Sequence, residues 1–124
     1  MNEKLIRICD DARAALKKVK NFHLRRWTFG RTYYQDATGN QMCVGCALTA
    51  IYVADNGPDC LSDRLDNQGS VCQHIKTKYA IADDVRMFFT SGFDAEHMHH
   101  KAIPEHIEYK EAYMAGHNLA KELL

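Results

Sequence analysis

Apolar side chains recur at steps of three and four along the first twenty residues. Leu5, Ile8, Ala12 and Leu16 share one stripe of a helix over residues 3–20. Lysines crowd the last turn, where they suit the negative end of the helix dipole. The pattern predicts an amphipathic helix that covers the core with one face.

Residues 43–54 form a run of twelve that is apolar at nearly every position. The run is longer than most strands, which favours a buried helix at the centre of the core. The turn-forming segment 55–58, with its Gly57 and Pro58, predicts the end of that helix.

Three further helices are predicted in the second half of the chain. Ser70 is a candidate cap for a helix that runs to about Tyr79. Gly92 is a stop signal for a helix that begins at Ala82 or Asp83 and runs to Thr90. The segment 108–123 is helical in its pattern. Its apolar stripe consists of small and aliphatic residues, which permit close approach to another helix: Ala112, Ala115, Gly116, Leu119, Ala120 and Leu123.

The stretch between the first two helices differs in composition. Aromatic and β-branched residues over 22–35 favour extended structure, and residues 36–40 form a turn signal. We therefore expect a short β-hairpin or arm around residues 22–42. The predicted fold is mainly α (α+β), as a single compact helical domain over residues 1–124.

Charge is balanced overall but uneven along the chain. The formal net charge is zero, which argues against the strongly basic domains that bind nucleic acid. Residues 1–31 hold nine lysines and arginines against three acids, whereas residues 32–124 hold seven against thirteen. Either the two parts face each other or water, or the basic part forms a patch for phosphates or an acidic partner. We favour the first interpretation.

The cysteines and the N-terminus bear on the compartment. The chain has no run of 18 apolar residues, and its first residues lack the apolar stretch of a secretory signal. Five cysteines are an odd number for a secreted disulfide framework. We expect a cytoplasmic protein with reduced thiols and no membrane partner.

The cysteine pair at 43 and 46 has three interpretations. It can pack as small apolar side chains, exchange thiol and disulfide, or bind zinc with two further ligands. The pair is not repeated, as it is in zinc ribbons and fingers. We favour packing and expect no cofactor. The alternative is a structural zinc held by Cys43, Cys46, Cys60 and Cys72.

Cys43 is also a candidate nucleophile. It stands at the predicted start of the helix over 43–54, and a helix N-terminus favours the thiolate. Such a nucleophile needs a nearby imidazole, for which His74 is our first candidate. His97, His99 and His117 remain open as alternatives.

A cluster of arginines and aromatic residues is the leading candidate for binding. These residue types stack on nucleic-acid bases and are enriched at the centres of protein interfaces. They also fit a strand whose aromatics cover the core while its arginines face water. The cluster consists of Arg25, Arg26, Trp27, Arg31, Tyr33 and Tyr34.

Part of this cluster belongs to a wider pattern. Trp27, a polar turn around Gly39, and Cys43 followed by Ala47 and Leu48 resemble a small uncharacterised domain family of phages and actinobacteria. Ala102-Ile103-Pro104 is similar to a later segment of that family. The resemblance implies a compact, phage-encoded domain and transfers no catalytic residue.

These observations together predict a small interaction module rather than an enzyme. We expect it to bind or inhibit a host or cellular protein, or a protein–nucleic-acid complex. Nucleic acid alone is the less favoured partner, and homo-oligomerisation is left open. The alternatives are a thiol enzyme using Cys43 and a zinc-binding domain.

Overall fold

The computed structural model describes residues 2–20, 22–29, 33–35, 41–57, 67–98 and 100–124. Within them the chain is mostly helical with a small sheet, which confirms the mainly α prediction. The helices are α1 (Glu3–Lys18), α2 (Ala47–Asn56), α3 (Gln68–Tyr79), α4 (Asp83–Asp94), the short 3-10 helix η2 (His100–Ala102) and α5 (Ile107–Leu123). The strands are β1 (Phe22–Leu24), β2 (Tyr33–Gln35) and β3 (Gln41–Gly45).

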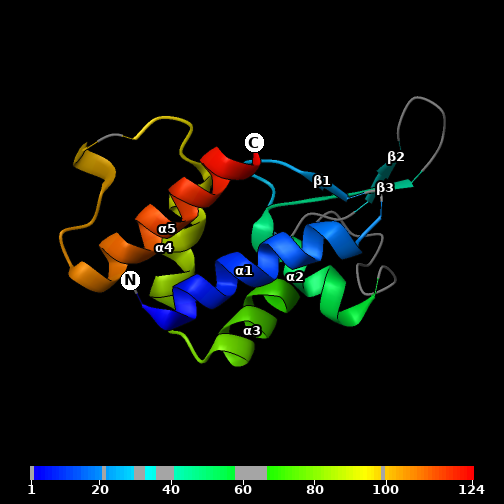
Figure 1. Cartoon of the computed structure of the whole chain (residues 1–124), viewed down its shortest axis with the longest axis horizontal. Helices are drawn as coiled ribbons and strands as arrows, with labels where there is room; N and C mark the ends of the chain where they lie inside the picture. The colour runs from blue at the N-terminus through cyan, green and yellow to red at the C-terminus, as the bar shows by residue number, and fades with distance from the viewer. Residues whose placement is uncertain (1, 21, 30–32, 36–40, 58–66, 99) are drawn as a thin grey trace.

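The sheet lies at one end of the helical body (Figure 1). β3 is its central strand, parallel to β1 and antiparallel to β2. Cys43 stands in the middle of β3, opposite Phe22 on one side and Tyr33 on the other. The antiparallel β2–β3 pair confirms a short β element in the predicted place, although the expected turn at 36–40 lies outside the described residues.

The helix predicted over 43–54 is wrong in its first part. The chain is a strand up to Gly45, Cys46 is the N-cap residue, and α2 begins at Ala47. A central strand that pairs on both sides is apolar throughout, as a buried helix is, so the run alone does not separate the two. From Ala47 on, the prediction is confirmed, because the helix is buried along most of its length.

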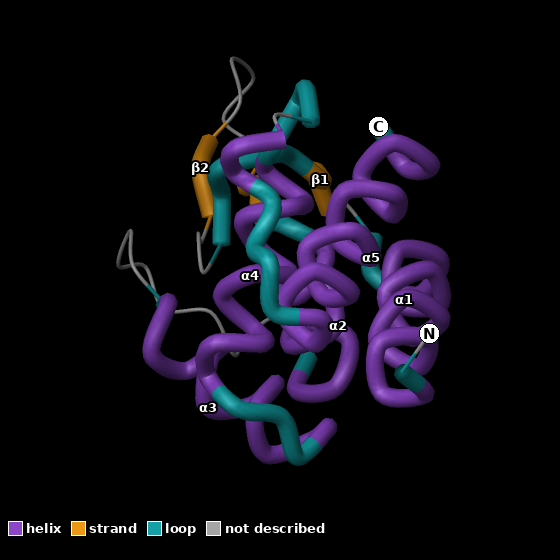
Figure 2. Tube along the Cα trace, turned by 90° about the vertical axis from the view of Figure 1, so that its left-hand side faces the viewer, coloured by secondary structure: helices purple, strands orange, loops and turns teal. Residues whose placement is uncertain are grey.

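The five α-helices share one apolar core. α1 contributes the buried side chains of Leu5, Ile8 and Ala12, as its periodicity predicts, and α2 packs beneath it. Asn2 caps α1 by accepting a hydrogen bond from the main-chain N–H of Lys4 at 2.8 Å. Figure 2 shows α5 beside α1, with α2 towards the middle of the bundle.

The backbones of α4 and α5 lie in direct contact. A Cβ atom on Gly92 of α4 would overlap the carbonyl oxygen of Tyr113, and one on Gly116 of α5 would overlap that of Phe89. The small residues of α5 thus permit the close approach that the sequence predicts. Gly92 does not end α4 as expected, since the helix continues to Asp94 and uses this glycine for packing.

The start of α3 also differs from the prediction. The helix begins at Gln68 after Asn67, so Ser70 lies inside it and is not its cap. Its predicted end is confirmed, because α3 runs to Tyr79 and closes on Ala80 with a φ of 51°. Residues 58–66, which precede α3, lie outside the described residues.

Candidate functional site

The aromatic and arginine cluster does not form one strand. β1 ends at Leu24, and residues 25–29 turn away and pack against α4. Within this segment Arg25 is exposed and Arg26 is half-buried. Arg31, together with the side chains of Tyr33 and Tyr34, lies outside the described residues.

Trp27 is the most conspicuous residue of this segment. Its side chain is 74% exposed, more than any other large apolar side chain in the described residues. Its φ is +63°, in the left-handed region that bulky side chains rarely adopt. An exposed indole on a strained backbone is costly in two ways, so the surrounding structure has to hold it.

The hold on Trp27 comes from a buried carboxylate. The main-chain N–H of Trp27 donates to Oδ1 of Asp94 at 2.7 Å. On either side, the N–H of Arg25 donates to the carbonyl of Gly45 at 3.0 Å, and the hydroxyl of Thr28 donates to the carbonyl of Arg25 at 2.6 Å. These bonds fix the segment to β3 and to the end of α4.

Asp94 is the last residue of α4 and is only 5% exposed. Burial raises the pKa of its carboxyl group, while the N–H of Trp27 and the charge of Arg26 act in the opposite direction. A buried carboxyl group at the edge of a hollow is a common mark of a functional site. Nothing in the sequence around Asp94 marks it as a site residue, so the sequence analysis misses it.

The segment 25–29 packs against a polar stripe on α4. Arg86, Thr90 and Asp94 are spaced one turn apart on this helix. The guanidinium of Arg86 stacks over the ring of Phe29, 4.6 Å from its centroid, and also lies 3.4 Å from Oδ1 of Asp83. The contacts explain why the aromatic residue at 29 turns inward while the one at 27 remains in water.

A hollow of about 390 Å³ opens beside Trp27. Its walls come from three parts of the chain: the turn after β1, the end of α4 with the following connector, and α5. We call it the Trp27 groove. It is lined by Trp27, Ser91, Asp94, Ala95, Glu96, His97, Ala102 and Tyr113.

The proposed pairing of Cys43 with His74 loses its main argument. Cys43 lies within a strand rather than at a helix N-terminus, and its side chain lies outside the described residues. His74 has other neighbours: its Nε2 is 2.7 Å from Oδ2 of Asp55, and its ring meets Tyr52 edge-on. The described contacts of His74 therefore do not include Cys43, and the thiol enzyme stays a prediction.

Asp55 also bonds to a lysine. Its Oδ2 also accepts a hydrogen bond from Nζ of Lys78 at 2.7 Å. Burial alone would raise the pKa of Asp55, but the bonds from Lys78 and His74 outweigh it and lower that pKa. The group ties the end of α2 to α3, which is a structural role.

The zinc alternative finds no support in the described cysteines. Cys46 is buried in the core, with its thiol 3.7 Å from the hydroxyl of Thr49, whereas Cys72 donates to Oδ1 of Asp83 at 3.1 Å. Among the described residues, no three His, Cys, Asp or Glu side chains are grouped to hold a metal ion. Cys60 and the side chain of Cys43 lie outside them, so a zinc site stays a prediction.

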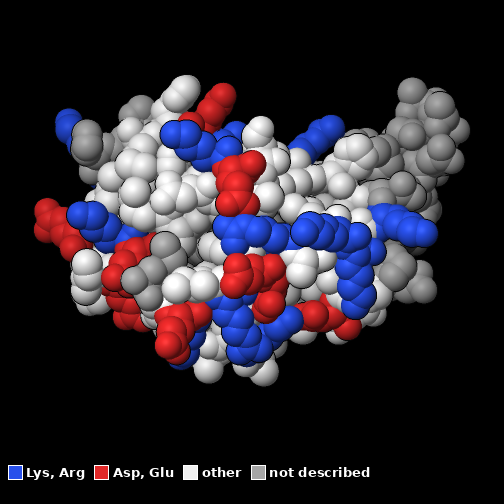
Figure 3. Space-filling model, viewed as in Figure 1, with Lys and Arg blue, Asp and Glu red and all other residues white. Residues whose placement is uncertain are grey.

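Several basic side chains of the N-terminal part bond to later parts of the chain. Arg13 donates to both carboxylate oxygens of Glu122, at 2.6 and 2.8 Å, and to Asp10 at 3.0 Å. Lys18 donates to the carbonyl of Ala54 at 2.9 Å. Figure 3 shows basic and acidic side chains interleaved across this face, as expected where the two parts of the chain face each other.

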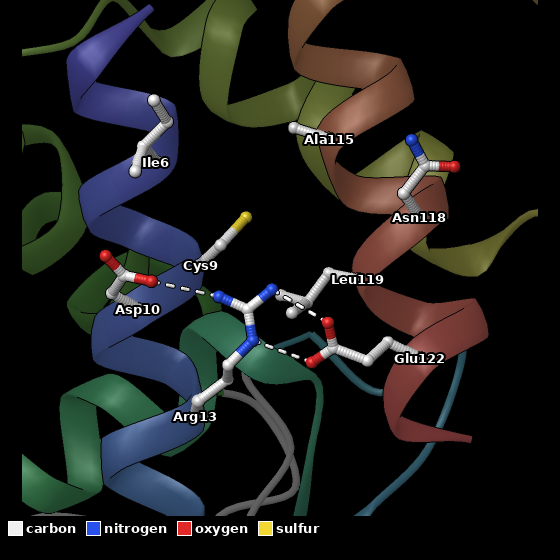
Figure 4. A pocket seen from close by; sticks show the side chains of 8 residues that line it. All are labelled: Ile6, Cys9, Asp10, Arg13, Ala115, Asn118, Leu119 and Glu122. Atoms are coloured by element: carbon white, nitrogen blue, oxygen red, sulfur yellow. Dashed lines mark hydrogen bonds and ion pairs between the residues drawn. The ribbon is translucent and has the colours of Figure 1, made fainter. Parts of the chain in front are cut away.

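A smaller hollow of about 210 Å³ lies between α1 and α5 (Figure 4). Cys9 lines it beside Arg13 and Leu119. Burial raises the pKa of the Cys9 thiol to about 11, so this group is protonated at neutral pH and is a poor nucleophile. Its two carboxylates, Asp10 and Glu122, are both bonded to Arg13, so we interpret the hollow as a gap beside this ion-pair group.

The chain was compared with protein-family models, with curated proteins and with solved structures, and none of them matches it. The resemblance to the phage and actinobacterial family therefore stays a prediction. Within the described residues, no helix combines the length and the apolar character needed to cross a bilayer.

Proposed function

We propose that this chain is a protein-binding module and that Trp27 is the centre of its contact surface. The observation that carries the proposal is that Trp27 has an exposed side chain and a constrained backbone. The indole is 74% exposed, yet its backbone is held at a φ of +63° by a buried carboxylate.

The energetics favour a functional explanation over a neutral one. A left-handed φ costs a residue with a side chain about 1–2 kcal/mol, and a glycine at this position would avoid the cost. The exposed ring offsets little of it, because it removes little apolar surface from water. Tryptophan is among the residues that dominate binding energy at protein interfaces, where its exposure in the free state is useful.

A protein partner suits this surface better than a nucleic acid. Asp94 and Glu96 place acidic groups in the Trp27 groove, and acidic groups repel a phosphate backbone. Arg13, the best-paired of the basic residues, is held by Glu122 and is not free to meet phosphates. We infer a host or cellular protein as the partner.

The described thiols bear on the compartment. Cys9, Cys46 and Cys72 are free cysteines, which supports a reducing environment. We propose that the chain acts in the cytoplasm. Its phage origin rests on the sequence resemblance and is tested by its neighbouring genes.

Affinity capture from the cells in which the protein acts tests the proposal. The immobilised chain is compared with Trp27→Ala and with Ile107→Ala, a matched control on α5 whose side chain is 67% exposed. The expected result is a protein retained by the parent chain and by the control, but depleted at least tenfold by Trp27→Ala. A retained set that is the same for all three proteins would show that Trp27 is not the contact centre.

A further inference from the structure

The Trp27 groove combines an aromatic face with acidic walls, which is a combination that selects for cations. Trp27 supplies an exposed aromatic ring, and Asp94 and Glu96 supply carboxylates. The negative face of an indole attracts a cation that lies within about 6 Å of its centroid. A carboxylate beside the ring strengthens the attraction and sets its direction.

Of the two acidic residues that line the groove, Glu96 is the one available to bind a cation. Arg26 lies close enough to Asp94 to lower its pKa, so the chain itself offsets part of the charge of Asp94. Within the described part of the chain, Glu96 is exposed and has no ion-pair partner. The groove therefore presents a net negative charge next to an exposed indole.

We propose that the Trp27 groove receives an arginine side chain from an exposed segment of the partner. This inference rests on the proposed function and names the chemistry of the residue that meets Trp27. A guanidinium is planar and weakly hydrated, so it stacks on an indole while its edge bonds to a carboxylate. A single exposed arginine on a flexible segment is enough to reach the hollow, whose volume is about 390 Å³.

Asp94 has two tasks in this arrangement. One oxygen, Oδ1, accepts the main-chain N–H of Trp27 and so holds the indole at the mouth of the groove. The negative charge of the same carboxylate favours a cation beside that ring. Glu96, two residues further along the chain, approaches the cation from the connector after α4.

A pair of capped peptides tests the assignment. Ac-Gly-Gly-Arg-Gly-Gly-amide carries the cation, and the same peptide with citrulline in place of arginine has nearly the same shape without charge. Trp27 is the single tryptophan of the chain, so the indole N–H resonance in a ¹⁵N spectrum reports on this groove alone. We expect a saturable shift of that resonance with the arginine peptide and at least fivefold weaker binding of the citrulline peptide.

Two variants test whether the charge of Glu96 contributes to peptide binding. Glu96→Gln should weaken binding of the arginine peptide by about two- to fivefold, the range of an exposed ion pair, and leave binding of the citrulline peptide unchanged. Glu105→Gln is the matched control, because Glu105 is exposed in the same connector but does not line the groove. It should bind both peptides as the parent chain does.

The outcomes also separate this inference from the proposed function. Equal response to both peptides, no response to either, or unchanged binding by Glu96→Gln overturns the assignment of arginine. If Trp27→Ala still abolishes partner capture in that case, the protein-binding function stands with another occupant. If capture does not depend on Trp27, the proposed function falls whatever the peptides do.

Discussion

Gly92 of α4 lies directly against the main-chain carbonyl of Tyr113 of α5, with no room for a Cβ atom between them. Asp94 follows Gly92 by two residues, and both Asp94 and Tyr113 line the Trp27 groove. The close crossing of α4 and α5 therefore sets the distance between two walls of the groove. Packing in the core and the geometry of the proposed site depend on the same glycine.

Replacing this glycine should be costly. Gly92→Ala forces the two helix backbones apart, and we expect it to lower the free energy of unfolding by about 1–3 kcal/mol. Gly69→Ala is the matched control on α3, because a Cβ atom there meets no other atom within 4 Å. It should raise stability by up to about 1 kcal/mol, since alanine favours a helix. Urea unfolding measures both, and equal stability of the two variants would contradict the backbone contact.

At the end of α3, replacing an alanine by glycine should raise stability. Ala80 is exposed and has a φ of +51°, which glycine adopts without penalty. Ala80→Gly should therefore stabilise the protein by about 1 kcal/mol. Ala14→Gly, at an exposed position inside α1, should destabilise it by about the same amount. Thermal unfolding of both variants would refute the left-handed cap if they shift the midpoint in the same direction.

Asp94 should make stability depend on pH in an unusual direction. Burial raises the pKa of its carboxyl group above the ordinary value of 3.8, so the folded state binds this proton more tightly than the unfolded chain. The contribution of Asp94 to stability therefore falls as the pH rises from 3.8 through the folded-state value, and is constant above it. Asp94→Asn should remove this fall, because its amide oxygen can still accept the N–H of Trp27.

The measurement is urea unfolding of the parent chain and Asp94→Asn between about pH 3 and pH 8. Subtracting one from the other cancels the carboxyl groups whose pKa is lowered, such as Asp55. The stability of the variant relative to the parent should grow with pH and then level off. A difference that shrinks as the pH rises would mean that Asp94 is better stabilised as an anion than its burial implies.

The cysteines should differ in their reaction with iodoacetamide. Burial raises the pKa of Cys46, and it raises that of Cys9 to about 11, so neither forms much thiolate at pH 8. We expect both to remain unmodified in the folded protein and to react in urea, as followed by peptide mass spectrometry. Rapid modification of either in the folded protein would place it outside the core. The same experiment tests Cys43: reaction only above an ordinary thiol pKa of about 8.5 counts against the thiol enzyme.

The sequence predicts some elements of this fold well because their signals are local. The stripe of Leu5, Ile8 and Ala12 marks α1, and the small residues around Gly116 mark the close packing of α5. The run at 43–54 is ambiguous because its strand part depends on pairing with β1 and β2, which lie apart from it in sequence. Pairing of this kind leaves no periodic trace within the segment itself.

The candidate site shows the same limit. Residue type alone identifies Trp27 as a binding candidate. Asp94 escapes notice because its role is a bond to the main chain of a residue 67 positions away. The left-handed backbone of Trp27, which makes its exposure meaningful, is likewise visible only in the folded chain.

The ¹⁹F resonance of the chain labelled with 5-fluorotryptophan tests the central claim most directly. Trp27 is the single tryptophan, so the labelled chain gives one signal, and tryptophans of the captured partner give none. We predict that saturation with the partner shifts this signal and removes its sensitivity to solvent isotope exchange between H₂O and D₂O, because the indole leaves water. A partner that binds while the signal keeps its position and its solvent sensitivity would contradict the account.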